Sequence, residues 1–135
     1  MAEIGLGTVQ FGMNYGISNK GGKTSTLDAS KLLQVATDNH IDVLDTASAY
    51  GTSESVLGEI LPKLHRFKVV TKISPLNLAK IEKEDIEKVE EVFKDSLNKL
   101  GQNKVFGLLL HNADDLLADG GFDLFSRLQQ FKSQG

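Results

Sequence analysis

The sequence predicts an α/β protein with a parallel sheet in which each strand is followed by a helix. Three observations lead to this prediction. Short apolar segments alternate with longer segments of helical periodicity, the β-α unit recurs four times, and the short segments are apolar on both faces. The repeat of roughly 32 to 36 residues suits βα units. Strands that are apolar on both faces are typical of parallel sheets covered by helices.

The first unit begins with a predicted strand over residues 4–9 and continues, after a polar loop, into a helix. Ser25 or Thr26 can cap this helix, and Asp28 suits its first turn because an acidic side chain is favoured near a helix N-terminus. The apolar stripe expected to face the sheet consists of Leu32, Leu33 and Ala36. The second unit pairs a strand over residues 41–45 with a helix over residues 53–64.

The third unit has a strand over residues 67–73, rich in β-branched side chains, and a helix over residues 83–100. This helix has the clearest periodicity in the chain, and Gly101 stands where a helix C-cap belongs. The fourth unit has a strand over residues 105–110 and a last helix that begins near Phe122. No linker or change of composition divides the 135 residues, so we interpret them as one structural unit.

Composition excludes several classes of function. Fifteen basic residues against eighteen acidic ones give a net charge of −3, which argues against an extended nucleic-acid surface or a polybasic membrane anchor. Cysteine is absent, so disulfides, thiolate nucleophiles and cysteine zinc sites are excluded, and we predict no metal site. No secretory leader or membrane-spanning segment is found. We therefore expect a cytoplasmic protein that binds neither nucleic acid nor membrane.

The ends of the predicted strands carry chemically useful side chains. Asp45, Lys72 and His111 lie at three successive strand ends, and Tyr50 follows Asp45 by five residues. Taken singly, each has an ordinary explanation as a loop cap, a solvated strand end, a core histidine or a half-buried ring. Ligands of parallel α/β folds bind at the carboxyl ends of the strands. Together, a carboxylate, an ammonium, an imidazole and a phenol there suit acid-base chemistry on a carbonyl group.

The physical chemistry of these groups is complementary. A free tyrosine has a pKa of about 10, and a nearby lysine ammonium lowers the pKa of a phenol by stabilising the phenolate. An aspartate beside the lysine holds the ammonium charged and oriented, while a histidine can hydrogen-bond a substrate oxygen. Such a site protonates an oxygen but supplies no hydride, so a reduction requires an external cofactor.

At these residues the chain resembles the aldo-keto reductase superfamily, over residues 4–111. The matching pieces are Gly-Leu-Gly-Thr at 5–8, Asp-Thr-Ala-Ser-Ala-Tyr-Gly at 45–51, Val-Val-Thr-Lys at 69–72 and Leu-Leu-Leu-His at 108–111. The resemblance implies a (β/α)8 barrel and NADPH-dependent reduction of a small aldehyde or ketone. By this analogy Tyr50 is the general acid, Lys72 tunes it, Asp45 pairs with Lys72, and His111 orients the substrate carbonyl.

The resemblance also implies contacts with the cofactor near its nicotinamide ribose. The residues concerned are Gly7, Thr8, Val9 and Asp45. Many family members carry an aromatic residue and a proline soon after the histidine, whereas residues 112–114 here are Asn-Ala-Asp, which leaves the substrate pocket undefined.

The length corresponds to half of such a barrel. A (β/α)8 barrel needs about 250 residues, or about 31 for each unit, so residues 1–135 match the N-terminal four units. The resemblance places most NADPH contacts after the later strands, so we expect this chain to be a fragment with little activity alone. Two open sheet edges and an uncovered inner face predict self-association. Two alternatives remain: a non-enzymatic module that binds a protein partner or its own copy, and a homodimer that rebuilds the barrel.

Overall fold

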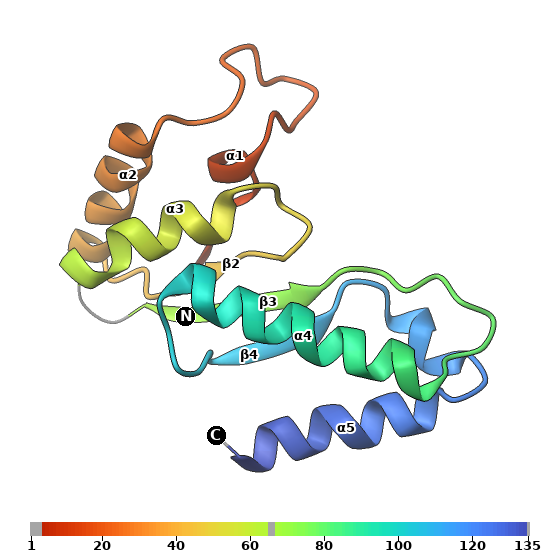
Figure 1. Ribbon diagram of the computed structural model, residues 1–135. Helices are drawn as coiled ribbons and strands as arrows, with labels where there is room; N and C mark the ends of the chain where they lie inside the picture. The colour runs from red at the N-terminus through yellow and green to blue at the C-terminus, as the bar shows by residue number, and fades with distance from the viewer. Residues whose placement is uncertain (1–3, 65–66, 135) are drawn as a thin grey trace.

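The computed structural model describes residues 4–64 and 67–134, and its strands form one parallel sheet in the order β1-β2-β3-β4 (Figure 1). The strands are β1 (Gly5–Gly7), β2 (Val43–Asp45), β3 (Lys68–Ile73) and β4 (Gly107–Leu110). The helices are α1 (Val9–Gly12), α2 (Thr26–Asp38), α3 (Ser53–Ile60), α4 (Lys83–Leu100) and α5 (Gly121–Gln134), with 3-10 turns η1 (Leu61–Lys63) and η2 (Ala113–Leu117). The predicted parallel α/β fold with four strands is confirmed.

The two faces of the sheet differ in their covering. Along β3, alternate side chains from Val69 to Ile73 are buried against the helices, while Val70 and Lys72 on the other face are only half-buried. Alternation of this kind follows from the two-residue period of a strand. One face is therefore packed under helices, and the other, which we call the open face, carries Lys72.

Two apolar clusters hold the helices to the covered face. One lies beneath α2 and α3 and includes Leu33, Leu44 and Leu57, each with no exposed surface. The other lies beneath α4 and α5 and includes Val89 and Leu124. Burial of a leucine or valine side chain contributes about 1.5–3 kcal/mol, so these clusters supply the main driving force for folding.

Helix α4 has the bounds that its periodicity predicts, and both its ends are capped. Glu82 and Asp85 form a capping box at its start, which satisfies backbone N–H groups that lack helical partners. Gly101 ends the helix in the left-handed conformation, with a φ of 63°, which glycine adopts without steric penalty. Ser25 caps α2 as predicted, because its hydroxyl accepts a hydrogen bond from the N–H of Asp28.

Three local predictions were wrong beyond shifts of one or two residues at the strand ends. Val9 was expected in the first strand but begins helix α1, because the Thr8 carbonyl accepts a hydrogen bond from the N–H of Phe11, whose ring is buried. The second helix was expected to reach residue 64, but α3 ends at Ile60 and a 3-10 turn follows with Pro62, which has no N–H to donate. Leu32 was expected on the buried face of α2, yet it is 47% exposed.

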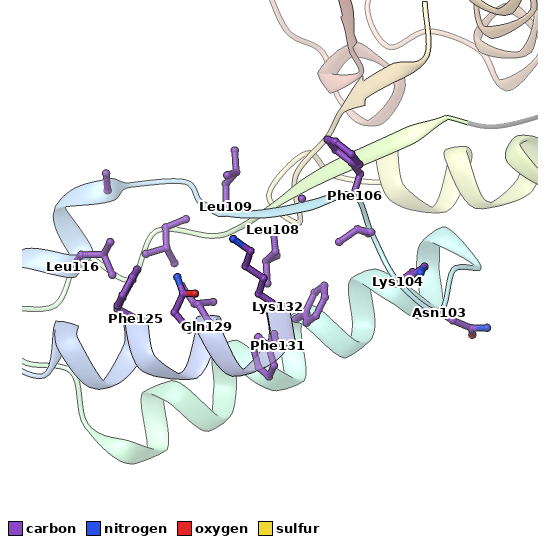
Figure 2. A pocket seen from close by; sticks show the side chains of 16 residues that line it. Asn103, Lys104, Phe106, Leu108, Leu109, Leu116, Phe125, Gln129, Phe131 and Lys132 are labelled. Atoms are coloured by element: carbon purple, nitrogen blue, oxygen red, sulfur yellow. The ribbon is translucent and has the colours of Figure 1, made fainter. Parts of the chain in front are cut away.

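An open-sided cavity of about 660 Å³ lies between helix α5 and the edge strand β4 (Figure 2). Leu108 points from the strand toward α5, while the Leu109 side chain points to the other side of β4. Phe125 and Phe131 contribute the wall on the helix. The polar side chain of Lys132 extends from α5 toward β4. The free edge of β4 and this cavity together form an apolar groove. Among the described residues, no helix is both long and apolar enough to cross a membrane.

Candidate active site

An ion pair joins the ends of β2 and β3 on the open face. Both oxygens of the Asp45 carboxylate lie 2.7 Å from Nζ of Lys72, and the carbonyl of Thr46 accepts a third hydrogen bond from this ammonium at 3.1 Å. The Lys72 side chain is 16% exposed and that of Asp45 is 43% exposed. The lysine is thus fixed by three acceptors, and the aspartate remains accessible from the open side.

Tyr50 lies in the loop between β2 and α3, which is bound closely to its neighbours. Ser48 donates hydrogen bonds from its N–H and its hydroxyl to the Lys72 carbonyl, at 3.0 and 2.9 Å. Gly51 has a φ of 57°, and a Cβ built on Gly12 would lie 1.7 Å from the Tyr50 carbonyl oxygen. Only glycine at position 12 permits this close approach, so helix α1 fixes the position of the tyrosine loop.

His111 extends the β4 ladder by one residue, because its N–H donates to the Ile73 carbonyl at 3.0 Å. Its ring meets the Tyr50 ring edge to face, with centroids 5.9 Å apart and an interplanar angle of 87°. The Lys72 ammonium lies 5.2 Å from the centroid of the same tyrosine ring. Each of these arrangements is attractive, as expected for an edge-to-face ring pair and for a cation near a π face.

The structure therefore brings all four predicted residues together. They form a row in the order Asp45, Lys72, Tyr50 and His111, which we call the site cluster. A carboxylate and an ammonium form one end of the row, and the phenol and the imidazole form the other. His111 is exposed, which does not fit the alternative explanation as a core histidine. Chemically, the cluster offers a proton donor beside a fixed positive charge and a second hydrogen-bonding ring.

The predicted cofactor-contact residues lie beside the site cluster but differ in accessibility. A Cβ built on Gly7 meets no atom of the described residues within 4 Å, so among these residues the space beside the end of β1 is open. Thr8 is fully buried, and its hydroxyl and N–H both donate to the Asp45 carbonyl at 3.0 Å. Val9 is half-buried at the start of α1. Gly7 and Asp45 are thus the more accessible members of this set.

Sequence reasoning missed the residues that hold the cluster in place. Ser48 and Gly12 both stand in segments that were expected to be loops, and no local pattern distinguishes them. Buried hydroxyls were also missed, although one signal was present. Thr71 interrupts the apolar side chains on the covered face of β3, between Val69 and Ile73. A polar residue at such a position indicates a buried hydrogen bond.

Comparison with known proteins identifies the group to which this arrangement belongs. The sequence model of the Aldo/keto reductase family matches residues 3–135. A solved structure from Pseudomonas aeruginosa, PA4992, assigned as an aldo-keto reductase, is 27% identical with a TM-score of 0.74. The match covers 93% of this chain and 50% of PA4992. MGS-M4, an aldo-keto reductase enzyme from a Medee basin deep-sea metagenome library, is 24% identical with a TM-score of 0.60.

The MGS-M4 match covers 96% of this chain and 42% of that protein, and at this identity the likeness shows the fold alone. No curated protein matches the chain significantly. The chain spans about half the length of the solved structures that it resembles. Since the family model covers nearly all of its residues, this protein belongs to the aldo/keto reductase family.

Proposed function

We propose that residues 1–135 are the proton-donating half of an NADPH-dependent reductase of small aldehydes or ketones. The observation that carries the proposal is the packing of Tyr50 against both the Lys72 ammonium and the His111 ring. Membership of the family supports an oxidoreductase in general. The role proposed for each side chain rests on the geometry of the site cluster, and the choice of NADPH and of a small carbonyl substrate rests on the family resemblance.

In the proposed mechanism, Tyr50 donates a proton to the carbonyl oxygen of the substrate as that oxygen gains negative charge. The Lys72 ammonium, 5.2 Å from the centroid of the tyrosine ring, stabilises the phenolate that remains because opposite charges attract. Asp45 holds the ammonium in place through two 2.7 Å contacts. His111, exposed at the end of β4, hydrogen-bonds the substrate oxygen and directs it toward Tyr50.

The residues present fit the nicotinamide end of a cofactor. Gly7 leaves open space next to Asp45, so a flat ring and its ribose can approach the end of β1 without meeting a side chain. When bound, a reduced nicotinamide supplies the hydride that the side chains of the site cluster cannot provide. Gly7, Val9 and Asp45 offer the contacts, while the Thr8 side chain acts indirectly through the Asp45 carbonyl.

The extent of the matches supports the half-barrel part of the proposal. The chain aligns with only 50% of PA4992, and in the part of the chain that the structure describes no strand pairs with the outer edges of β1 and β4. In a barrel, four further βα units would join these edges and cover the open face. Those units would also supply the remaining cofactor contacts.

The test is NADPH-dependent reduction of a simple aldehyde, followed by the loss of nicotinamide absorbance. It is run on the complete product of the gene that encodes residues 1–135, and on the 135-residue chain alone. We expect turnover by the complete product and little or none by the isolated chain. Absence of turnover by the complete product, with any of several small aldehydes and ketones, would overturn the proposed function.

A second candidate function is a non-enzymatic half-barrel module that binds a protein partner or its own copy. The observation in its favour is the apolar groove beside β4, with Phe106 68% and Leu109 48% exposed. Assembly through this groove needs no cofactor, so Tyr50→Phe would leave it unchanged. A module with no chemistry to perform has no need of the site cluster, and for this reason we rank it second.

A further inference from the structure

A buried polar layer lies beneath the site cluster, on the covered side of the sheet. Thr8, Thr46 and Thr71 come from the ends of β1 and β2 and from β3, and all three are fully buried. Elsewhere on the covered face the strands bury apolar side chains, such as Leu44 and Val69. A buried hydroxyl is unfavourable unless it is hydrogen-bonded, so a cluster of three at one level of the sheet requires partners.

Ser53, the first residue of α3, provides the partners for two of the strands. Its hydroxyl donates to the Thr8 carbonyl at 2.9 Å and accepts a hydrogen bond from the Thr46 hydroxyl at 3.1 Å. The Ser53 oxygen also lies 2.9 Å from the Thr8 hydroxyl oxygen. Ser53 has no exposed surface, so water does not compete for these bonds. One side chain thus joins α3 to the ends of both β1 and β2.

Glu54, the next residue, provides the partner for the third strand. Its carboxylate accepts a hydrogen bond from the Thr71 hydroxyl at 2.6 Å, and the residue is only 3% exposed. The short distance is typical of a hydrogen bond to a charged acceptor. Its charge also acts on Lys99, whose pKa is raised first by the hydrogen bond to Asp95 and further by Glu54.

Each bond of this layer lies next to a member of the site cluster. The Ser53 N–H donates to the Tyr50 carbonyl at 3.0 Å, and the Thr8 hydroxyl donates to the Asp45 carbonyl. Thr71 directly precedes Lys72 in β3. We propose that Ser53 and Glu54 are positioning residues that hold the tyrosine loop on the strands and so set Tyr50 relative to Lys72 and His111. The catalytic meaning of this role rests on the proposed function, whereas the positioning itself does not.

A general contribution to stability would not account for this placement. Apolar side chains at the same positions would stabilise the covered face by burial alone, as they do at Leu44 and Val69. A hydrogen-bonded layer instead fixes direction and distance, because each bond tolerates little change in geometry. The layer lies next to Asp45, Lys72 and Tyr50, whose relative positions matter for the proposed chemistry.

The test detects the contact between the Tyr50 and His111 rings by NMR in the 135-residue chain, with no cofactor or substrate added. The chain has two tyrosines and no tryptophan, so carbon-13-labelled tyrosine gives few ring signals, and the exposed Tyr15 serves as an internal reference. We expect Ser53→Ala and Glu54→Leu to lose the cross-ring contacts with His111. Glu54→Gln keeps an acceptor oxygen for Thr71 and is expected to retain them.

Ser96→Ala is the matched control, since Ser96 is a serine in α4 with 1% exposure, outside the polar layer. We expect Ser96→Ala to keep the Tyr50–His111 ring contact even if its unfolding midpoint is lower than that of the wild type. If Ser53→Ala does not fold by circular dichroism, Thr46→Val removes one of its hydrogen bonds, the one from the Thr46 hydroxyl to Ser53, with little change of shape. Loss of the ring contact in Thr46→Val is then the expected result.

The proposal is overturned if the Ser53 and Glu54 variants are less stable but keep the Tyr50–His111 contact of the wild type. It is also overturned if Glu54→Gln loses the contact as fully as Glu54→Leu, because the Thr71 hydrogen bond would then not be the cause. The ring contact is measured without turnover. If only the proposed reductase function is wrong, the complete gene product will not reduce aldehydes, but the NMR results will still be those expected here.

Discussion

Lys72 places its ammonium 2.7 Å from both carboxylate oxygens of Asp45, across two neighbouring strands of the sheet. The same ammonium lies 5.2 Å from the centre of the Tyr50 ring. One lysine therefore links a carboxylate, which holds it, to a phenol, which experiences its charge. This relationship makes the ion pair part of the proposed chemistry as well as of the fold.

Replacing Lys72 with methionine is expected to lower the free energy of unfolding by about 1–2 kcal/mol. The variant loses hydrogen bonds to a charged partner, but Asp45 is 43% exposed and regains water. Lys68→Met is the matched control on the same strand, because Lys68 pairs with Asp42 where both side chains are about half exposed. Urea denaturation measures both variants, and equal losses would show that the Asp45–Lys72 pair has no special role.

Gly12→Ala is expected to lower the free energy of unfolding by about 1–3 kcal/mol, since its methyl group would overlap the Tyr50 carbonyl and the N–H of Ser53. The tyrosine loop must shift to admit it. Gly7→Ala is the control, because a Cβ there meets open space, and its unfolding free energy should change by less than about 0.5 kcal/mol. A Gly12→Ala variant as stable as the wild type would contradict the close approach of α1 to this loop.

Acid is expected to weaken the attachment of α5 to α4. Hydrogen bonds from Arg127 and then Lys94 hold the pKa of Glu90 below its ordinary value of 4.5. A carboxyl with a lowered folded-state pKa stabilises the fold above its unfolded pKa, and this contribution is lost as the pH falls through the folded-state value.

Urea denaturation at several pH values measures this loss, and Glu90→Gln should show a smaller decrease in stability below about pH 4.5 than the wild type does. Glu91→Gln, at the exposed neighbouring position, controls for the removal of one negative charge. Identical pH profiles for Glu90→Gln and the wild type would contradict the contribution of the Arg127 contact.

The isolated chain is expected to self-associate through its open edge. Leu109 is 48% exposed on β4 beside the apolar groove, so Leu109→Gln should shift the chain toward the monomer in light scattering. Leu27→Gln is the matched control, since Leu27 is 67% exposed on α2, away from this edge. A stable wild-type monomer at micromolar concentration would overturn the expectation.

Periodicity predicted the elements whose structure depends on their own sequence. Helix α4 matched its predicted bounds because its apolar spacing and Gly101 both act within the segment. The prediction for Val9 failed because its helical conformation depends on contacts outside its own segment. Phe11 is buried, and the backbone of Thr8 is hydrogen-bonded both to β2 and to Ser53. Partners of this kind, distant in sequence, leave no local pattern.

The composition of the site cluster could be predicted because parallel strands bring their carboxyl ends to one edge of a sheet. The contacts that hold the site cluster in place could not be predicted in this way. The serine hydroxyl of Ser53 reaches Thr8 across 45 residues of sequence, and Gly12 touches the Tyr50 loop across a similar span. Which face of β3 receives Thr71 becomes evident only when the sheet is covered by helices.

Turnover by Tyr50→Phe tests the central claim most directly, in the complete gene product with NADPH and a simple aldehyde. Since the variant keeps the ring but has no proton to donate, we expect kcat to fall roughly 100-fold or more. Tyr15→Phe, at the other, exposed tyrosine, should turn over at the wild-type rate. If a folded Tyr50→Phe enzyme reduces the aldehyde as fast as Tyr15→Phe, Tyr50 is not the proton donor.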